Sequence, residues 1–249
     1  MNLKKKSIQN LPVKKYLYFH FIFIFTNYGY QSISDPMRIL PEKTVERLST
    51  YRRTLYKCLD EGKARIYSHE LADLHNITAV QVRRDMMMIG FSTFQRKGYE
   101  ITELINIISD IIDPKDSINV GVVGFGHLGK AISSYFIGKR PKLNLVATFD
   151  IDPKKIGNNQ LGVQCYSIER LREIVINKEI SICILTVPPN SAQEMAKILV
   201  QAGIKGILNF TTVNLNVPDN INLEEYDMIT SIEKLAYFVK DTSKSKRII

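Results

Sequence analysis

The order of apolar and polar residues changes character once along this chain. Up to about residue 112, apolar residues recur at the spacing of amphipathic helices. Beyond residue 117, short continuous apolar runs alternate with helical stretches. The pattern therefore predicts a helical front module, followed by an α/β module whose strands form a parallel sheet.

The first helix of the front module is expected to begin at Pro41-Glu42 and to end at Gly62. Its predicted buried face carries four apolar residues, Val45, Leu48, Leu55 and Leu59. At the other end of this module, residues 100–112 form an apolar helix with six aliphatic positions, and Asp113–Asp116 reads as a linker.

Two short helices between these have the layout of a helix-turn-helix. Ser68 is the expected N-cap of the first, which ends at Leu74 before the turn His75-Asn76. The second begins at Thr78, whose hydroxyl can cap it with Gln81 as the capping-box partner, and it stops at Gly90. Its predicted core face carries Val82, Met86 and Ile89, and Met86-Met87-Met88 is read as core packing with one exposed member.

Polar residues on the second helix are left to face DNA. In a helix-turn-helix the second helix enters the major groove, and arginines near its start contact bases and phosphates. We therefore predict that Thr78, Gln81, Arg83 and Arg84 contact DNA. The alternative is a solvated helix face on which the arginines pair with Asp85 or Glu70.

The stretch that follows fits a β-wing. Phe94–Tyr99 places Arg96 and Lys97 beside a turn at Gly98, where both cations can reach the minor groove or its phosphates. Arg96 and Lys97 complete the predicted DNA-binding residues.

The back module opens with a nucleotide-binding pattern. A buried strand, Ile118–Val123, runs directly into Gly124-Phe125-Gly126-His127-Leu128-Gly129; a helix follows, and the next strand ends at Asp150. Glycines at this spacing allow a tight turn, close approach of a diphosphate and close helix–strand packing, while the helix N-terminus faces the phosphates. The carboxylate of Asp150 can accept hydrogen bonds from a ribose and repels a 2′-phosphate, which favours NAD(H) over NADP(H). The alternative is a glycine-rich turn without a ligand.

Two further strands are expected to complete the dinucleotide site. One leads into Thr186-Val187-Pro188 and the other ends at Asn209 and Phe210, and ligands of doubly wound sheets lie at such carboxyl ends. Phe210 either flanks a ring of the ligand or closes the core. The last predicted helix runs from Ser231 to Lys240.

No catalytic constellation and no metal site is evident in the sequence. The four histidines are scattered, and His127 lies inside the glycine loop, where we expect it to shape the turn. A dehydrogenase needs a positioned acid or base near the nicotinamide. We therefore predict that the chain is not an enzyme and that NADH or NAD⁺ acts as a signal.

Charge and cysteine content sharpen this picture. The net charge of +9 divides into +4 over residues 1–36, +5 over residues 37–99 and zero over residues 100–249. The front module thus suits a polyanion and the back module does not. Three cysteines without redox or zinc spacing favour a reduced, cytoplasmic protein. Residues 1–36 combine lysines with a nine-residue apolar run, too short for the ~20 residues of a membrane span, and are expected to be a dispensable extension.

These motifs together resemble the Rex family of redox-sensing transcriptional repressors. The similarity runs from about Leu40 to Lys240, and its segments occur in family order: Gln81–Asp85, Arg96–Tyr99, Val123–Gly129, Phe149–Pro153, Leu185–Pro188, Ala202–Phe210 and Leu215–Pro218. The resemblance implies a homodimer that binds a palindromic operator when NAD⁺ prevails and releases it when NADH accumulates. It also implies a switch in which Arg53 and Asp227 form or break a pair between the domains, while Tyr135 competes for that carboxylate.

The resulting expectation is an α/β protein with an N-terminal winged helix-turn-helix domain and a C-terminal Rossmann-type doubly wound sheet. The predicted boundaries are 1–36 for the extension, 37–113 for the DNA-binding domain and 117–230 for the NAD(H)-binding domain. Residues 231–241 form a helix swapped into the partner of a dimer, and 242–249 form a basic tail. The alternatives are an NAD-dependent oxidoreductase with a basic N-terminal dimerisation arm, and a regulator that senses another nucleotide or a sugar phosphate.

Overall fold

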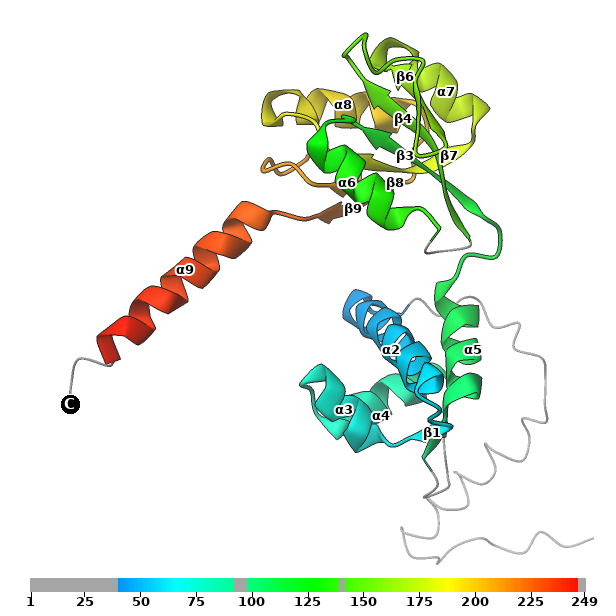
Figure 1. Cartoon of the computed structure of the whole chain (residues 1–249), viewed down its shortest axis with the longest axis vertical. Helices are drawn as coiled ribbons and strands as arrows, with labels where there is room; N and C mark the ends of the chain where they lie inside the picture. The colour runs from blue at the N-terminus through cyan, green and yellow to red at the C-terminus, as the bar shows by residue number, and fades with distance from the viewer. Residues whose placement is uncertain (1–39, 92–97, 139–141, 246–249) are drawn as a thin grey trace, which may run out of the picture. The chain divides into compact units, whose positions relative to one another are not determined.

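Two compact units make up the chain, dividing between Ile108 and Ser109 (Figure 1). The computed structural model describes residues 40–91, 98–138 and 142–245. The expectations for residues 1–36 and for Arg96 and Lys97 lie outside these ranges. Within them, no helix is both long enough and apolar enough to cross a membrane.

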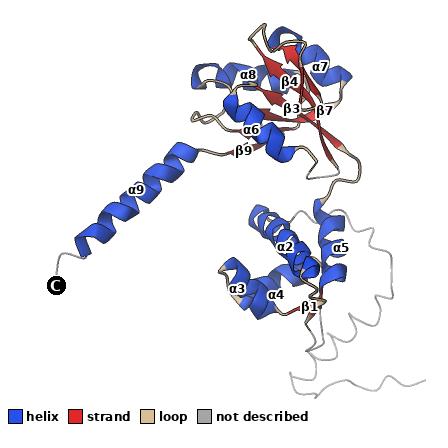
Figure 2. Ribbon diagram, viewed as in Figure 1, coloured by secondary structure: helices blue, strands red, loops and turns tan. Residues whose placement is uncertain are grey.

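Helices dominate the first unit, as the sequence pattern predicts (Figure 2). The sequential helices are α2 (Glu42–Asp60), α3 (Ser68–His75), α4 (Ala79–Met88) and α5 (Ile101–Ile112), whose last turn lies beyond the division between the units. A short antiparallel sheet joins β1 (Arg65–Ile66) to β2 (Tyr99–Glu100). This pairing joins the segment between α2 and α3 to the residues just before α5.

The buried face of α2 differs in part from the prediction. Leu48 and Leu55 are fully buried, but Val45 and Leu59 are 39% and 38% exposed. Tyr51 and Cys58 are buried in their place. The apolar stripe is centred nearer to Tyr51 than the four predicted aliphatic residues indicated, so Val45 falls at its edge, and Leu59 lies in the last turn.

The N-terminus of α3 is also corrected. Ser68 is the first helical residue and not the N-cap, which is Tyr67. The backbone N–H of Tyr67 donates to the carboxylate of Glu70 at 2.7 Å, so an acid within the first turn satisfies the backbone donor of the N-cap residue.

The second unit contains a seven-stranded sheet in the order β5-β6-β4-β3-β7-β8-β9. Every neighbouring pair is parallel except β5 with β6. The six parallel strands have the order of a Rossmann fold, which confirms the doubly wound prediction. Their bounds are β3 (Ile118–Val123), β4 (Leu143–Asp150), β5 (Asn159–Gln160), β6 (Val163–Ser167), β7 (Ile180–Leu185), β8 (Gly206–Asn209) and β9 (Asn222–Glu225).

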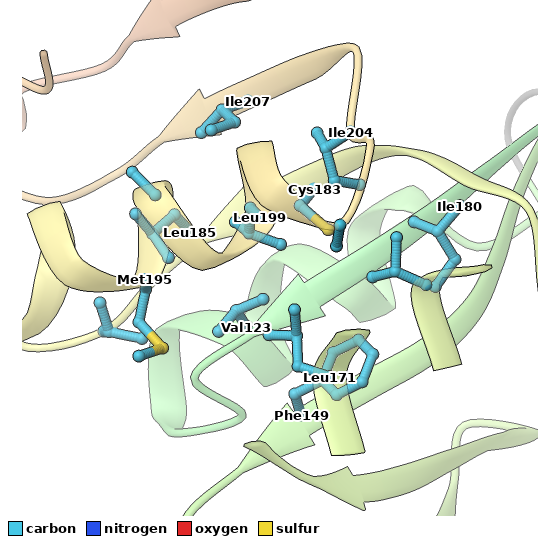
Figure 3. Packing of buried hydrophobic residues seen from close by; sticks show 14 of the residues in the cluster. Val123, Phe149, Leu171, Ile180, Cys183, Leu185, Met195, Leu199, Ile204 and Ile207 are labelled. Atoms are coloured by element: carbon cyan, nitrogen blue, oxygen red, sulfur yellow. The ribbon is translucent and has the colours of Figure 1, made fainter. Parts of the chain in front are cut away.

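Helices cover both faces of this sheet. On one face, α7 (Leu171–Asn177) and α8 (Pro189–Gln201) pack on the strands around Phe149, Leu185 and Leu199 (Figure 3). On the other face, Ile132 of α6 (His127–Phe136) packs against a cluster that includes Val122 and Phe125. Burial on both faces explains why β3 and β7 are predominantly apolar in the sequence.

All three cysteines are buried free thiols. Cys183 lies in the core on the α8 side of the sheet and Cys165 in the core on the α6 side. Burial raises the pKa of the Cys183 thiol to about 12, and burial also raises the pKa of Cys165. These thiols are therefore core residues with little thiolate character.

The last helix, α9 (Met228–Ser245), begins three residues earlier than predicted and continues past Lys240. Asp227 explains the early start, because its carboxylate accepts hydrogen bonds from the backbone N–H of Ile229 at 2.8 Å and of Thr230 at 3.1 Å. Every side chain from Met228 to Lys240 is exposed. The exposed side chains include a helical stripe of apolar residues: Met228, Ile232, Leu235 and Val239.

Candidate functional site

The glycine loop lies where the strand order of the sheet reverses. From β3 the chain passes to β4 on one side, and later to β7 on the other, so the carboxyl ends of β3 and β7 border a crevice of the kind that binds nucleotides. Gly124–Gly126 leaves β3 and Gly126 is the N-cap of α6. The first backbone N–H groups of α6 therefore point toward this crevice.

Each glycine of the loop is explained by its surroundings. Gly124 has φ +92°, and a Cβ there would lie 2.6 Å from the carbonyl oxygen of Thr186. A Cβ at Gly129 would overlap the carbonyl oxygen of Gly124, so α6 packs against the loop without room for a side chain. A Cβ at Gly126 would meet nothing within 4 Å. The open space in front of Gly126 fits a diphosphate approaching the helix N-terminus, as the dinucleotide prediction requires.

Side chains of the glycine loop divide into core and surface. Phe125 is fully buried, so only its backbone can face a ligand. His127 is exposed at the start of α6, and Leu128 beside it is 36% exposed. Of the three, His127 and Leu128 have side chains able to reach a ligand, and their contact stays a prediction.

Asp150 lies at the end of β4 and is only 6% exposed. Its Oδ1 accepts a hydrogen bond from the backbone N–H of Asp152 at 2.9 Å, and its Oδ2 accepts one from the Lys155 ammonium at 2.7 Å. Burial raises the pKa of the Asp150 carboxyl, but these bonds outweigh it and hold the pKa below its ordinary value. Asp150 is therefore an ionised acceptor held in place at the end of the second strand, where a ribose is bound in this fold.

Lys155 was missed by the sequence reasoning. It follows Asp150 by five residues and returns to it through a turn. A lysine shortly after the strand-terminal acid is a usable signal, although lysines in turns are common.

Thr186 and Val187 lie on the opposite side of the crevice from Asp150. The Thr186 hydroxyl donates to the carbonyl oxygen of Gly124 at 2.7 Å, and the Thr186 N–H donates to that of Val123 at 2.9 Å. Val187 is 8% exposed, and its Cγ1 would lie 3.0 Å from a Cβ at Gly124. Thr186 thus joins the two loops of the crevice. Pro188, also predicted here, is exposed as the N-cap of α8.

Asn209 and Phe210 end β8. Asn209 is 1% exposed; its Nδ2 donates to the carbonyl oxygen of Val213 at 2.8 Å and its Oδ1 accepts from Thr211. The Asn209 side chain therefore stabilises the loop that follows β8. Phe210 is half-buried and packs against the cluster that includes Val122 and Phe125. The centroid of its ring lies 5.4 Å from that of Tyr226.

The second candidate site is α4 in the first unit. Thr78 is its N-cap, and the Thr78 hydroxyl accepts from the backbone N–H of Gln81 at 3.1 Å, as predicted. The prediction of Gln81 as the capping-box partner is wrong, because the Gln81 side chain is bonded to Asp85 instead. Val82 and Met86 are buried, while Ile89 is half-buried.

The outward face of α4 carries both arginines that were predicted to contact DNA. Arg83 and Arg84 are exposed, and Arg83 Nη1 donates to the Ser68 hydroxyl at 3.1 Å. The alternative pairing with Asp85 or Glu70 is wrong, because Asp85 pairs with Arg47 and Glu70 with Lys63, both at 2.7 Å. The face also presents Val80, 65% exposed, and Met87, 70% exposed. Met87 is the one exposed member expected of Met86-Met87-Met88, whereas the exposure of Val80 had not been predicted. Exposed apolar groups on such a face can contact thymine methyls.

A buried polar network anchors α4 to α2. Asp85 is completely buried, and Arg47 binds both its oxygens, from Nε at 2.7 Å and Nη2 at 2.8 Å. The Tyr51 hydroxyl donates to Oδ2 at 2.9 Å and the Gln81 amide to Oδ1 at 2.9 Å. Burial raises the pKa of the Asp85 carboxyl, but the hydrogen bonds from these three donors hold the pKa below its ordinary value.

The three residues proposed to form a switch lie in different units. Arg53 is exposed on α2, and its Nη1 lies 3.5 Å from the Ser49 hydroxyl. Tyr135 on α6 is 73% exposed. The Asp227 carboxylate caps α9, and its bonds with Thr230 lower its pKa. Their joint role stays a prediction.

A helix-turn-helix with an exposed basic face, joined in one chain to a Rossmann unit with an open glycine loop, defines a DNA-binding regulator with a nucleotide-binding domain. Family models agree with both halves. Residues 39–86 match "Putative DNA-binding protein N-terminus", and residues 115–213 match "CoA binding domain".

Known proteins identify the family. The chain is 36% identical over 200 residues to the redox-sensing transcriptional repressor Rex of Leuconostoc citreum, covering 80% of this chain and 93% of that protein. It is 35% identical to Rex of Bacillus licheniformis, covering 84% and 97% of the two chains. The crystal structure of RSP, a Rex-family repressor, has a TM-score of 0.74 at 32% identity and covers 84% of this chain and 98% of that one. RSP in complex with NAD⁺ and operator DNA has a TM-score of 0.76 at 32% identity, covering 84% and 97%. This chain belongs to the Rex family of redox-sensing transcriptional repressors.

Proposed function

We propose that this chain is a transcriptional repressor that binds a palindromic operator when NADH is low and releases it when NADH binds. The observation that carries the proposal is the presence, in one chain, of an exposed basic recognition helix and a Rossmann crevice whose residues fit a dinucleotide. The solved complexes of the relative RSP with NADH, and with NAD⁺ and operator DNA, support it.

The nucleotide-binding residues have separate roles in this proposal. Gly126 leaves room for the diphosphate, and the backbone N–H groups at the start of α6 bind it. Asp150 accepts hydrogen bonds from the adenosine ribose, and its ionised state suits NAD(H) better than NADP(H). These contacts provide affinity for both redox states alike.

Discrimination between the redox states falls to residues near the nicotinamide ring. NADH and NAD⁺ differ in the charge of that ring, which is neutral when reduced. Val187 and Phe210 offer apolar surface beside the crevice, and burying a charge against apolar surface costs free energy. These two side chains therefore favour the neutral form, and the preference shifts the population of dimer conformations.

A second copy of this chain is the partner that we propose for α9. The apolar stripe Met228, Ile232, Leu235 and Val239 is 47% to 67% exposed, and soluble chains rarely leave such a stripe uncovered. A palindromic operator also requires two recognition helices, with half-sites about one helical turn, ~34–36 Å, apart. We propose that α9 is swapped into the partner, as in the family.

The switch would use charge at the domain boundary. In one state Arg53 pairs with the Asp227 carboxylate, and in the other Tyr135 competes for it. Asp227 already accepts from Thr230 Oγ1 at 2.6 Å, so a pairing with Arg53 would add to, or replace, the cap of α9. The switch would thereby be coupled to the helix proposed to join the two copies.

A gel-shift titration tests the proposal. The full chain is incubated with a palindromic operator and titrated with NADH, with NAD⁺ as the control. Release by NADH alone is the expected result. A chain that oxidises NADH and never shifts DNA would be an oxidoreductase, and one that binds DNA but ignores NADH would sense another ligand.

Two variants assign the roles of the units. Arg84→Ala should weaken operator binding and leave NADH affinity unchanged, because Arg84 is exposed on α4. Leu235→Asp should convert the dimer to a monomer in size-exclusion chromatography, whereas Lys234→Asp, next to it on α9, should not. We propose that the protein works in the cytoplasm, where free thiols such as its own stay reduced.

A further inference from the structure

Gln81 is a residue of the recognition helix whose side chain is held by a buried carboxylate. It lies in the first turn of α4, the part of a recognition helix that contacts base edges. It is half-buried, and its Nε2 lies 2.9 Å from Asp85 Oδ1. By contrast, Arg83 and Arg84 are fully on the surface.

The chemistry of Asp85 determines which end of the Gln81 amide faces the protein. An ionised carboxylate only accepts hydrogen bonds. Its remaining acceptor positions receive hydrogen bonds from Arg47 and Tyr51. Together with Gln81, these residues donate four hydrogen bonds to the carboxylate. The Gln81 amide must therefore turn its NH₂ group to Asp85, and rotation by 180° would bring two oxygens together.

We propose that Asp85 orients Gln81 so that its carbonyl oxygen is presented to DNA, which makes Gln81 a reader of an exocyclic amino group. Such donors in the major groove are N6 of adenine and N4 of cytosine. A glutamine that is free to rotate can present either its oxygen or its NH₂ group to a base. Here one N–H is directed at a carboxylate that is completely buried, so the carbonyl oxygen is fixed as the acceptor and the second N–H can donate to N7 of the same adenine.

The network gives this orientation its rigidity. Arg47 and Tyr51 both belong to α2, so the carboxylate that holds Gln81 is itself held by another helix. Asp85 is thus a positioning residue, and Gln81 is the group that would touch the base. The inference rests on the proposed function, because it assumes that α4 enters the major groove.

Base analogues test it on the full chain. A duplex is first selected from a library with randomised palindromic half-sites. Each adenine is then replaced in turn by purine, which lacks the N6 amino group, and by 7-deazaadenine, which lacks N7; each cytosine is replaced by 2-pyrimidinone, which lacks N4. Affinities are measured for the wild type, for Gln81→Leu, and for Gln201→Leu, a matched change at an exposed position of α8.

The expected result is one position per half-site at which loss of the amino group weakens wild-type binding about three- to tenfold. Gln81→Leu should be insensitive to that loss, and Gln201→Leu should behave like the wild type. Sensitivity to loss of N7 without any sensitivity to loss of an amino group would show that the amide nitrogen, and not the oxygen, faces the base, and would overturn the proposal. A Gln81→Leu variant that responds to every analogue like the wild type would overturn it as well.

Asp85→Asn tests the positioning role. An asparagine can accept or donate at the contact with Gln81, so the Gln81 amide can turn over and its coupling to the amino group should fall. A merely structural role would weaken all duplexes by the same factor, which would refute the positioning role. NADH titration reports whether the second unit of the Asp85→Asn variant is folded. If the substitution unfolds the first unit, the proposal is decided by the comparison of the wild type with Gln81→Leu. A wild-type chain that selects no duplex would refute the proposed function itself, which is a different outcome from selection without coupling to Gln81.

Discussion

Replacing Arg47 by methionine should loosen the first unit while leaving the second unchanged. The Arg47 side chain is 26% exposed, whereas that of Asp85 is 0% exposed. Methionine keeps much of the aliphatic stem and removes the guanidinium, which leaves a buried carboxylate with the donors of Tyr51 and Gln81. Removal of one partner from a buried ion pair costs about 3–5 kcal/mol. Because Arg47 is partly exposed and two donors remain, we expect a loss of about 2–3 kcal/mol.

Hydrogen exchange measured by mass spectrometry reports this loss in each unit separately. Since 1.36 kcal/mol is tenfold in an equilibrium constant, the most protected amides of α2 should exchange about 30- to 160-fold faster. Peptides from β3 and β7 provide the internal reference and should not change. The matched control is Arg170→Met, which removes an exposed pair with Glu173 and should alter no exchange rate measurably. Acceleration below threefold in α2, or equal acceleration in β3, would refute the reasoning.

Three other perturbations test separate parts of the structure. Gly129→Ala should lower the melting temperature and weaken NADH binding in fluorescence titrations, because its Cβ would overlap the Gly124 carbonyl oxygen and lie 2.9 Å from Thr186 Oγ1; unchanged binding would contradict the close packing of α6. Asp150→Ala should weaken NADH and NAD⁺ by the same factor in calorimetry, and a selective effect would place Asp150 near the nicotinamide instead. The folded pKa of Asp85 lies below the ~3.9 of an unfolded chain, so its stabilisation is present above about pH 4 and is lost as pH falls through the folded pKa. The urea midpoint of the wild type, followed by far-ultraviolet circular dichroism, should fall as the pH is lowered below about 4. The midpoint of Arg47→Met should fall less over the same pH range.

The strands that could be predicted are those buried on both faces. Ile118–Val123 is predominantly apolar, and the structure reproduces its bounds as β3. β9 has only one apolar residue, Leu223, among polar neighbours, so its sequence contains no strand signal. It is a strand because the edge of β8 pairs with it, a contact between distant segments that periodicity does not record.

The site shows the same division between local and distant information. The glycine loop, Asp150 and the Thr78 cap are local motifs with fixed spacing, and each was predicted from the sequence. The partners of Asp85 are 34 and 38 residues away on α2, so its burial and its hold on Gln81 needed the structure. From the sequence, Asp85 had a role only in the alternative, as a surface partner for neighbouring arginines, since sequence proximity was the only guide.

The buried thiols have a consequence for how a redox sensor stays selective. Oxidants such as peroxides attack thiolates that are accessible and of low pKa. Cys165 and Cys183 are fully buried with raised pKa values, and Cys58 is only 7% exposed. The chain therefore offers oxidants no ready thiolate, and its information about redox state has to come through the nucleotide crevice. Burial of the thiols thus lets the protein respond to the NADH/NAD⁺ ratio without responding to peroxides.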